Sequence, residues 1–280
     1  MALNTVNIRS PLRWETKFAF SLNRDKITKL YGSEVDKDIV NSWFVGEPIS
    51  SIYDYTMTGG VWTEQELYNK EITTKGYYPG NWRLADLNGD GAIDPNNDRS
   101  IIGYATPNYR FSINNTLSYK NFTLNIFINS IMGGDGYFLQ NNADLVAPSS
   151  STDNVQRVNQ YTIRQYWTPD NGVDNCNGLF YSPPYVAGVY EDRSFVRLKD
   201  ISLNYSFGKR MLDALKLMGC DIFLSGKNLY TWTKWSGWDP ETTLITTSTY
   251  NTPGAPLAYT TSADTEPMMK SIIAGVRLSW

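Results

Sequence analysis

The densest group of oxygen-bearing side chains lies between residues 86 and 98, where the chain reads Asp86-Leu-Asn-Gly-Asp-Gly-Ala-Ile-Asp94. Asp86, Asn88 and Asp90 have the spacing of the first, third and fifth ligands of an EF-type calcium loop, and Gly91 supplies the sharp turn at the sixth position. A hard cation requires such a dense oxygen shell. We therefore expect a Ca²⁺ site with the following candidate ligands: Asp86, Asn88, Asp90, the carbonyl of Ala92, Asp94 and Asp98.

This segment departs from the EF-type pattern at its last ligand. Position 12 is Asn97 rather than glutamate, and Asp98 lies one residue later, after Pro95. A bulge would bring Asp98 into the ligand set. The alternative is a turn rich in Asp, Asn and Gly that binds nothing.

Aromatic residues make up 14% of the chain, and several tryptophans fall near the expected ends of strands. Trp167, Trp235 and Trp238 are candidate ligand contacts, because indole rings stack on sugars and grip peptides. The alternative is that they belong to an interfacial belt or to loop packing. Both interpretations stay open on the sequence alone.

Composition excludes several classes of function. The net charge is −3 and the pI about 5.1, so the chain lacks the basic surface that nucleic-acid binding requires. It has no histidine, which removes the commonest general base and zinc ligand. Glu191, Asp192 and Asp239 do not have the spacing of a glycosidase pair, and we expect no enzyme. Cys176 and Cys220 fall at opposite ends of the expected strands, so we expect no disulfide.

Period-2 alternation of apolar and polar residues is the main structural signal. In the last ten residues Ile272, Ala274, Val276, Leu278 and Trp280 share one face. The clearest hairpin runs from Tyr109 to Ile131 and turns at Lys120-Asn121. We expect about eight strands, at residues 2–8, 14–22, 49–57, 109–119, 122–131, 195–207, 220–232 and 271–280. Short helices are expected at 63–70, 152–166 and 209–218.

The character of the polar face favours a transmembrane β-barrel over a soluble sandwich. It carries mostly Ser, Thr and Asn, as expected for a hydrated lumen, and the chain ends on an aromatic residue. If Trp280 is periplasmic, the long loops 61–106, 132–193 and 233–267 lie outside, and the turns 119–121 and 208–218 lie inside. Residues 31–45 are the exception, as a long inner connection.

Several segments together resemble the SusC/RagA family of TonB-dependent outer-membrane transporters. They are Asp86 to Gly91 with Asp98 to Gly103, Pro107 to Phe111, Leu117 to Phe122, Arg164 to Pro169, Ser194 to Tyr205, Leu224 to Tyr230, Trp235 to Pro240 and Gly275 to Trp280. Their order and spacing span nearly the whole chain.

The resemblance implies that residues 1–280 are the carboxy-terminal part of a plugged barrel of about 22 strands. The plug, TonB box and signal peptide would lie outside this chain. It implies an outer-membrane protein, embedded in lipid, that imports glycans or peptides with a SusD-like surface lipoprotein and draws energy through TonB. Gly275, Leu278 and Trp280 look like the terminal signal for barrel assembly, although Ile273 stands where a polar residue is usual.

A second hypothesis belongs to another class of protein. The alternating strands and abundant aromatic residues also fit a secreted β-rich module that binds glycans. Such a module would bury its apolar faces in a closed core, whereas a barrel wall would leave them exposed to lipid.

Overall fold

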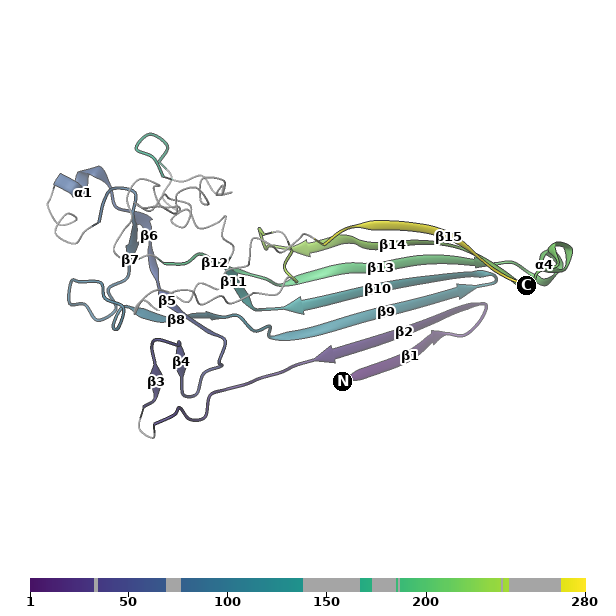
Figure 1. The fold of residues 1–280 in the computed structure, drawn as a ribbon, viewed down its shortest axis with the longest axis horizontal. Helices are drawn as coiled ribbons and strands as arrows, with labels where there is room; N and C mark the ends of the chain where they lie inside the picture. Colours follow the sequence, from purple (N-terminus) through teal and green to yellow (C-terminus); the bar gives the residue numbers. More distant parts are fainter. Residues whose placement is uncertain are drawn as a thin grey trace.

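One antiparallel sheet forms the main body of the protein (Figure 1). The computed structural model describes residues 1–32, 35–68, 77–137, 167–172, 185, 187–237, 239–241 and 268–280. The seven strands of this sheet, which we call the wall, are, in spatial order, β1 (Ala2–Ile8), β2 (Leu12–Ser21), β9 (Tyr109–Tyr119), β10 (Phe122–Met132), β13 (Phe195–Ser206), β14 (Gly219–Thr233) and β15 (Ser271–Ser279). We call the end that carries Trp280 the inner end and the opposite end the outer end.

The strand register sorts the side chains of the wall into one apolar and one polar face. Residues opposite one another on neighbouring strands point to the same side. One such row across β2 to β15 holds Trp14, Leu117, Leu124, Leu203, Leu224 and Ala274. The adjacent row on the other face holds Glu15, Thr116, Asn125, Ser202, Ser225 and Ile273. The alternation expected from the sequence is thus continued across the strands.

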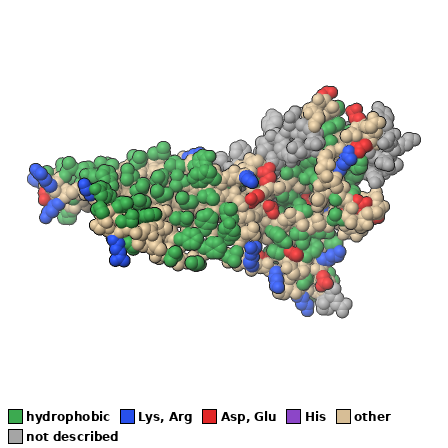
Figure 2. All heavy atoms as spheres, turned by 180° about the vertical axis from the view of Figure 1, so that it is seen from behind, with side chains coloured by type: hydrophobic (Ala, Val, Ile, Leu, Met, Phe, Trp, Pro, Cys, Tyr) green, Lys and Arg blue, Asp and Glu red, His purple; other side chains and the backbone are tan. Residues whose placement is uncertain are grey.

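The apolar face of the wall is exposed and has the height of a membrane. Leu224 is 52% exposed and Val276 60%, and green side chains gather along the wall in Figure 2. The 11 residues of β9 rise about 33 Å, which a tilt of about 40° reduces to about 25 Å, the height of a lipid-facing band. Aromatic residues border this band. At the inner end they are Trp14, Tyr119, Phe122, Tyr205 and Trp280, and at the outer end Phe20, Tyr109, Tyr230 and Trp232.

The expected antiparallel membrane-barrel segment is confirmed, with one correction to its strand count. The wall has seven strands in the described residues, not about eight. The segment 49–57 divides into β5 (Ser51–Tyr55) and β6 (Met57–Val61), which pair with β8 (Arg99–Tyr104) and β7 (Trp82–Leu84) outside the wall. Alternation signals a half-buried strand but does not identify its partner.

This correction also removes the expected long inner connection. The described residues between 22 and 108 lie at the outer end, between β2 and β9, so the described part of 31–45 lies outside as well. The inner connections are the short segments 9–11, 120–121 and 207–218. The last of these contains α4 (Lys209–Leu215), as expected.

The remaining short elements lie at the outer end, beyond the wall strands (Figure 1). They are β3 (Lys37–Asp38), β4 (Trp43–Phe44), α1 (Glu64–Tyr68), β11 (Asp135–Tyr137) and β12 (Tyr190–Asp192), with β5 to β8. Among the described residues, no helix is both long and apolar enough to cross a membrane. The expected helix at 152–166 and Cys176 lie outside the described residues.

Candidate functional site

A buried arginine on the polar face anchors the loop that follows β14. Arg197 of β13 is fully buried, and its Nη2 donates to both carboxylate oxygens of Asp239 at 2.8 and 2.7 Å. Its Nη1 donates to Glu241 at 2.7 Å and its Nε to Thr231 at 2.9 Å. A buried guanidinium is costly unless its donors are satisfied, and here two carboxylates and a hydroxyl satisfy them.

A second set of contacts fixes the same loop. Arg193 Nη2 donates to the carbonyl of Pro240 at 2.8 Å, and its guanidinium lies 5.8 Å from the ring centre of Trp235. Glu191 accepts hydrogen bonds from the backbone and hydroxyl of Ser236 at 3.0 and 2.7 Å. Residues 235–237 and 239–241 are therefore held at the outer ends of β13 and β14. We call these two sets of contacts the rim clamp.

The structure describes two of the three tryptophans predicted to contact ligand, and both are packed against other residues. Trp235 is 6% exposed and belongs to the rim clamp. Trp167 lies against Gly80, where an added Cβ would be 2.2 Å from the indole Cε3. Trp238 lies outside the described residues. A ligand role for these residues stays a prediction.

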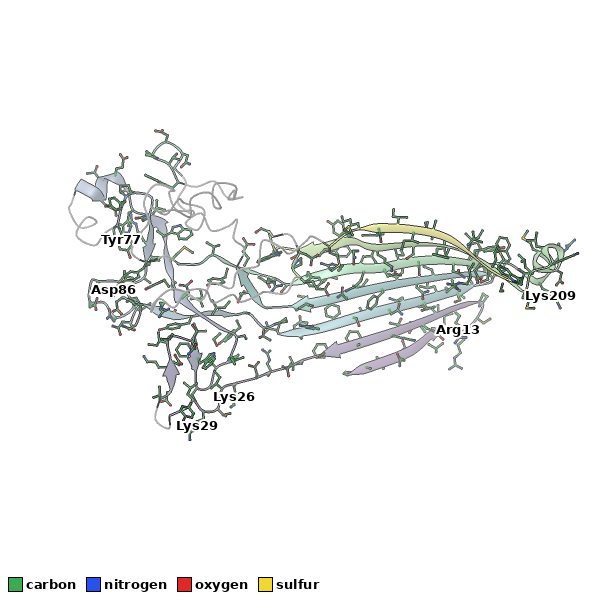
Figure 3. The ribbon with its side chains drawn as sticks, in the orientation of Figure 1. Arg13, Lys26, Lys29, Tyr77, Asp86 and Lys209 are labelled. Atoms are coloured by element: carbon green, nitrogen blue, oxygen red, sulfur yellow. The ribbon has the colours of Figure 1, made fainter. Side chains whose placement is uncertain are left out.

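The carboxylate-rich loop lies between β7 and β8, far from the wall, where Figure 3 labels Asp86. The carboxylate of Asp86 accepts from the backbone amides of Gly89 and Gly91 at 2.6 and 2.7 Å. Asp90 accepts from the amide of Ala92 at 2.8 Å and from the side chain of Asn88 at 2.8 Å. The loop is thus folded by its own carboxylates, with the predicted ligands brought into one short segment.

Asp98 differs from the other candidate ligands because it is fully buried. Its two oxygens accept from the amides of Leu87 and Asp94 at 2.8 and 2.7 Å, which closes the base of the loop. Among the described residues, no three Asp, Glu, Cys or His side chains converge as a metal-ligand set. These oxygen donors fit Ca²⁺ in their chemistry. Asp98 is the candidate ligand whose two oxygens already close the loop.

Asp54 of β5 is a buried carboxylate that sequence reasoning missed. It is fully buried and accepts from the amide of Gly188 at 2.8 Å, the amide of Tyr55 at 2.7 Å and the hydroxyl of Tyr190 at 3.3 Å. Burial raises the pKa of Asp54 to about 6. This side chain joins β5 to the segment that leads into β12. Asp54 and Gly188 are 134 residues apart in sequence, so no local sequence pattern predicts their contact.

We expect the junction between β5 and residues 187–190 to weaken as the pH rises. The folded-state pKa of Asp54 is about 6, above its ordinary value of 3.8. The protonated form therefore stabilises the junction fully below about pH 4, and this stabilisation is lost as the pH rises through 6. The full effect is at most about 3 kcal/mol. Hydrogen exchange of residues 51–55 in the full-length protein, corrected for the intrinsic rate, should be slower at pH 5 than at pH 8.

The matched control is Asp54→Asn, which keeps an acceptor and does not titrate. It should exchange at the same corrected rate at both pH values. A variant that retained the pH dependence would assign the effect to another group.

The three residues predicted as an assembly signal all lie in or at the end of β15. Gly275 is opposite Phe223, and a Cβ added to Gly275 would be 2.6 Å from the phenyl ring. Leu278 and Trp280 belong to the apolar face, and Trp280 is 83% exposed. Ile273 belongs to the polar face, opposite Ser225. Their role in assembly stays a prediction.

Comparison with known proteins identifies relatives along most of the chain. No family model matches. TonB-dependent receptor P3 of Formosa agariphila is 31% identical over 253 residues, covering 86% of this chain and 24% of the relative. TonB-dependent receptor P26 of the same organism is 28% identical over 259 residues, covering 86% and 25%. The chain therefore spans about a quarter of the length of these relatives.

Solved structures share the fold. A structure of the RagAB peptide transporter matches with a TM-score of 0.67 and 20% identity, over 100% of this chain and 28% of the matched chain. The open-open state of the RagAB peptide importer matches with a TM-score of 0.65 and the same identity and coverage. The chain is therefore similar to TonB-dependent receptors along most of its length, and it shares the fold of the RagAB structures.

Proposed function

We propose that the chain is the carboxy-terminal wall of a SusC/RagA-type outer-membrane transporter that imports glycans or peptides together with a SusD-like surface lipoprotein. Energy would come through TonB, which would contact a part of the protein outside this chain. The observation that carries the proposal is the wall itself, with an exposed, mainly apolar face and a polar face lined mainly by Ser, Thr and Asn. The relatives of the chain are named as TonB-dependent receptors.

The outer end supports the role of the lipoprotein partner. The described parts of the long connections of the wall lie there, which provides a broad surface above the lumen. The rim clamp holds the root of one of these connections over the polar face through Arg197. A fixed outer surface of this kind suits a lid that opens and closes above the barrel. The exposed apolar face argues against a secreted glycan-binding module, which would bury it.

Cysteine labelling of intact cells tests the membrane placement. Asp170 lies at the outer end and Asp213 in α4 at the inner end, and both are exposed aspartates. In a full-length protein without other cysteines, Asp170→Cys should react with a membrane-impermeant maleimide on intact cells. Asp213→Cys should react only after the outer membrane is permeabilised.

Two outcomes would contradict the membrane placement. Equal labelling of both positions on intact cells, or recovery of the full-length protein without the outer membrane, would overturn the placement.

Copurification of a surface lipoprotein with the tagged full-length protein tests the partner. Its absence after gentle detergent extraction would contradict that part of the proposal.

We also propose that the loop between β7 and β8 binds Ca²⁺ weakly. Asp86, Asn88, Asp90, the carbonyl of Ala92 and Asp94 would supply oxygens, and Asp98 would hold the loop closed. Extracellular calcium sites typically have dissociation constants of about 10⁻⁴ to 10⁻³ M.

Calorimetric titration of the full-length protein with Ca²⁺ tests this site. We expect binding heat in the millimolar range that the double substitution Asp86→Asn with Asp90→Asn removes. Absence of heat from the unsubstituted protein at millimolar Ca²⁺ would reject the site, because the loop would then be a turn that binds nothing.

A further inference from the structure

A groove lies at the outer end of the wall, on its apolar side, and encloses about 480 Å³. Met132 on β10 borders it on one side, and Tyr230 and Trp232 on β14 border it on the other. The strand between them, β13, carries the small side chain of Val196 at this level, preceded by Ser194. The groove is therefore the space that two small side chains leave between larger ones.

The β14 side of the groove belongs to the aromatic border at the outer end. The ring centres of Tyr230 and Trp232 lie 4.7 Å apart, and the two residues are 53% and 52% exposed. Aromatic residues at this level of a membrane barrel lie where acyl chains meet polar headgroups. A ligand that fills the groove would thus have an apolar part below the border and a polar part above it.

Two charged side chains line the same groove. Lys234 is exposed, and its ammonium makes no ion pair or hydrogen bond with any described residue. Asp192 accepts from the amide and the hydroxyl of Ser194 at 2.8 and 2.5 Å, both through Oδ1. Its Oδ2 accepts no hydrogen bond from the described part of the chain. The groove therefore offers a cation that can bind an anion and a carboxylate oxygen that can accept a hydrogen bond.

These two charges together select one class of headgroup. A bare phosphate on Lys234 would also meet the carboxylate of Asp192, and the like charges would repel. A neutral lipid would leave the ammonium without an anion. A sugar that carries a phosphate avoids both problems, because its phosphate accepts from Lys234 while a neighbouring hydroxyl donates to Asp192.

We propose that this groove binds a phosphorylated glycolipid of the outer leaflet of the membrane. The phosphate lies on Lys234, a sugar hydroxyl donates to Asp192, and an acyl chain lies between Met132 and Trp232. The proposal rests on the proposed function, which places the apolar face in lipid and the outer end outside the cell.

Native mass spectrometry of the full-length protein, stripped of lipid in detergent, tests this site. The probe is diphosphorylated lipid A. The comparison lipids are its fully dephosphorylated form and phosphatidic acid, which has a phosphate but no sugar. Lipid A should bind about tenfold or more tightly than either, since each lacks one charge-assisted contact. Equal binding of either comparison lipid would overturn the proposal.

Excess inorganic phosphate separates a lipid site from a site for free phosphate. Inorganic phosphate has the anion but no acyl chain, so it should not displace lipid A. Displacement would show that the groove selects phosphate alone and would overturn the glycolipid assignment.

A matched pair of lysine variants tests the phosphate contact. Lys234→Gln should weaken lipid A binding about tenfold or more and leave binding of the dephosphorylated form unchanged. The control is Lys227→Gln, because Lys227 is an exposed lysine of the same strand that points to the polar face, opposite Asp200. It should leave lipid A binding unchanged. Equal effects of the two substitutions would contradict a site at Lys234.

A third variant tests the groove without changing its charge. Val196→Phe fills the space between β10 and β14 and should weaken binding of lipid A and of its dephosphorylated form alike. Folding is judged by mobility in unheated detergent gels. If this variant does not fold, Trp232→Ala removes the aromatic side of the groove and provides the same test. Unchanged binding by the folded variant would overturn the proposal.

The cysteine labelling described above distinguishes the two kinds of failure. If Asp170→Cys and Asp213→Cys label as expected but lipid A shows no preference for the groove, only the glycolipid site fails. If those positions do not label as expected, the membrane placement fails together with the site.

Discussion

Replacement of Ile201 by lysine is expected to cost the folded barrel about 2 to 4 kcal/mol. Ile201 lies on the apolar face near the middle of the wall, opposite Ile126 on β10 and Gly226 on β14. A lysine at the bilayer midplane must lose its hydration, and the cost falls towards the interfaces. Denaturant unfolding of the full-length protein in lipid vesicles, followed by gel mobility, measures the change.

The neighbouring residue on the same strand provides the control. Ser202 points to the polar face, opposite Asn125 and Ser225. Ser202→Lys should change the unfolding free energy by less than about 1 kcal/mol, because a lumen position remains hydrated. Equal costs for the two lysines would mean that the two faces of the wall do not differ in their exposure to lipid.

Replacement of Arg197 by methionine should destabilise the folded protein about as much as Ile201→Lys does. Ile201→Lys places a new charge in lipid, whereas Arg197→Met leaves two existing carboxylates without their cation. Arg197→Met leaves the carboxylates of Asp239 and Glu241 beside an apolar side chain, at a cost of about 3 to 5 kcal/mol. Part of this cost is avoided if the loop root detaches and the carboxylates reach water. We therefore expect faster protease cleavage near residue 239 on intact cells and a lower denaturant midpoint.

Two further variants isolate the ion pairs of the rim clamp. Arg197→Met combined with Asp239→Asn and Glu241→Gln should recover much of the loss, because no buried charge is left unpaired. Arg13→Met removes an exposed arginine that pairs with Glu15 and should cost less than about 1 kcal/mol. A triple variant no more stable than Arg197→Met would show that packing, rather than charge, holds the loop.

The first prediction depends on which face of a strand Ile201 and Ser202 occupy, and the sequence determined that. The face of Arg197 was decided only by the structure, because a register shift between Leu198 and Asp200 places Arg197 on the polar face although it has the same parity as Ile201. Successive side chains point to opposite sides of a strand, so the alternation in Phe195 to Phe207 separates Ile201 from Ser202 before any partner strand is known. The tight turn at Lys120-Asn121 is equally local, with Lys120 at a positive φ of 53°. The inner turns and the barrel class followed from these local patterns and from the resemblance to a family.

The partners of each strand were decided only by the tertiary structure. The segment 49–57 was expected to be a wall strand, yet β5 pairs with β8, and Ile52 and Tyr55 are buried at the outer end. A period-2 pattern records that a strand has two environments, but lipid and a small protein core are both apolar. This ambiguity produced the count of about eight strands.

The rim clamp is also a product of tertiary structure. Trp235 and Asp239 stood out in the sequence as a possible ligand contact and an unassigned carboxylate, but Arg197 lies 42 residues before Asp239. Side-chain chemistry shows that a buried arginine needs carboxylates, but not which loop will supply them. The sequence by itself determined most strand positions, the faces of residues away from register shifts and the inner turns, because these depend on near neighbours. The chain fold decided which strands form the wall and which loop closes over Arg197, because those contacts join residues far apart in sequence.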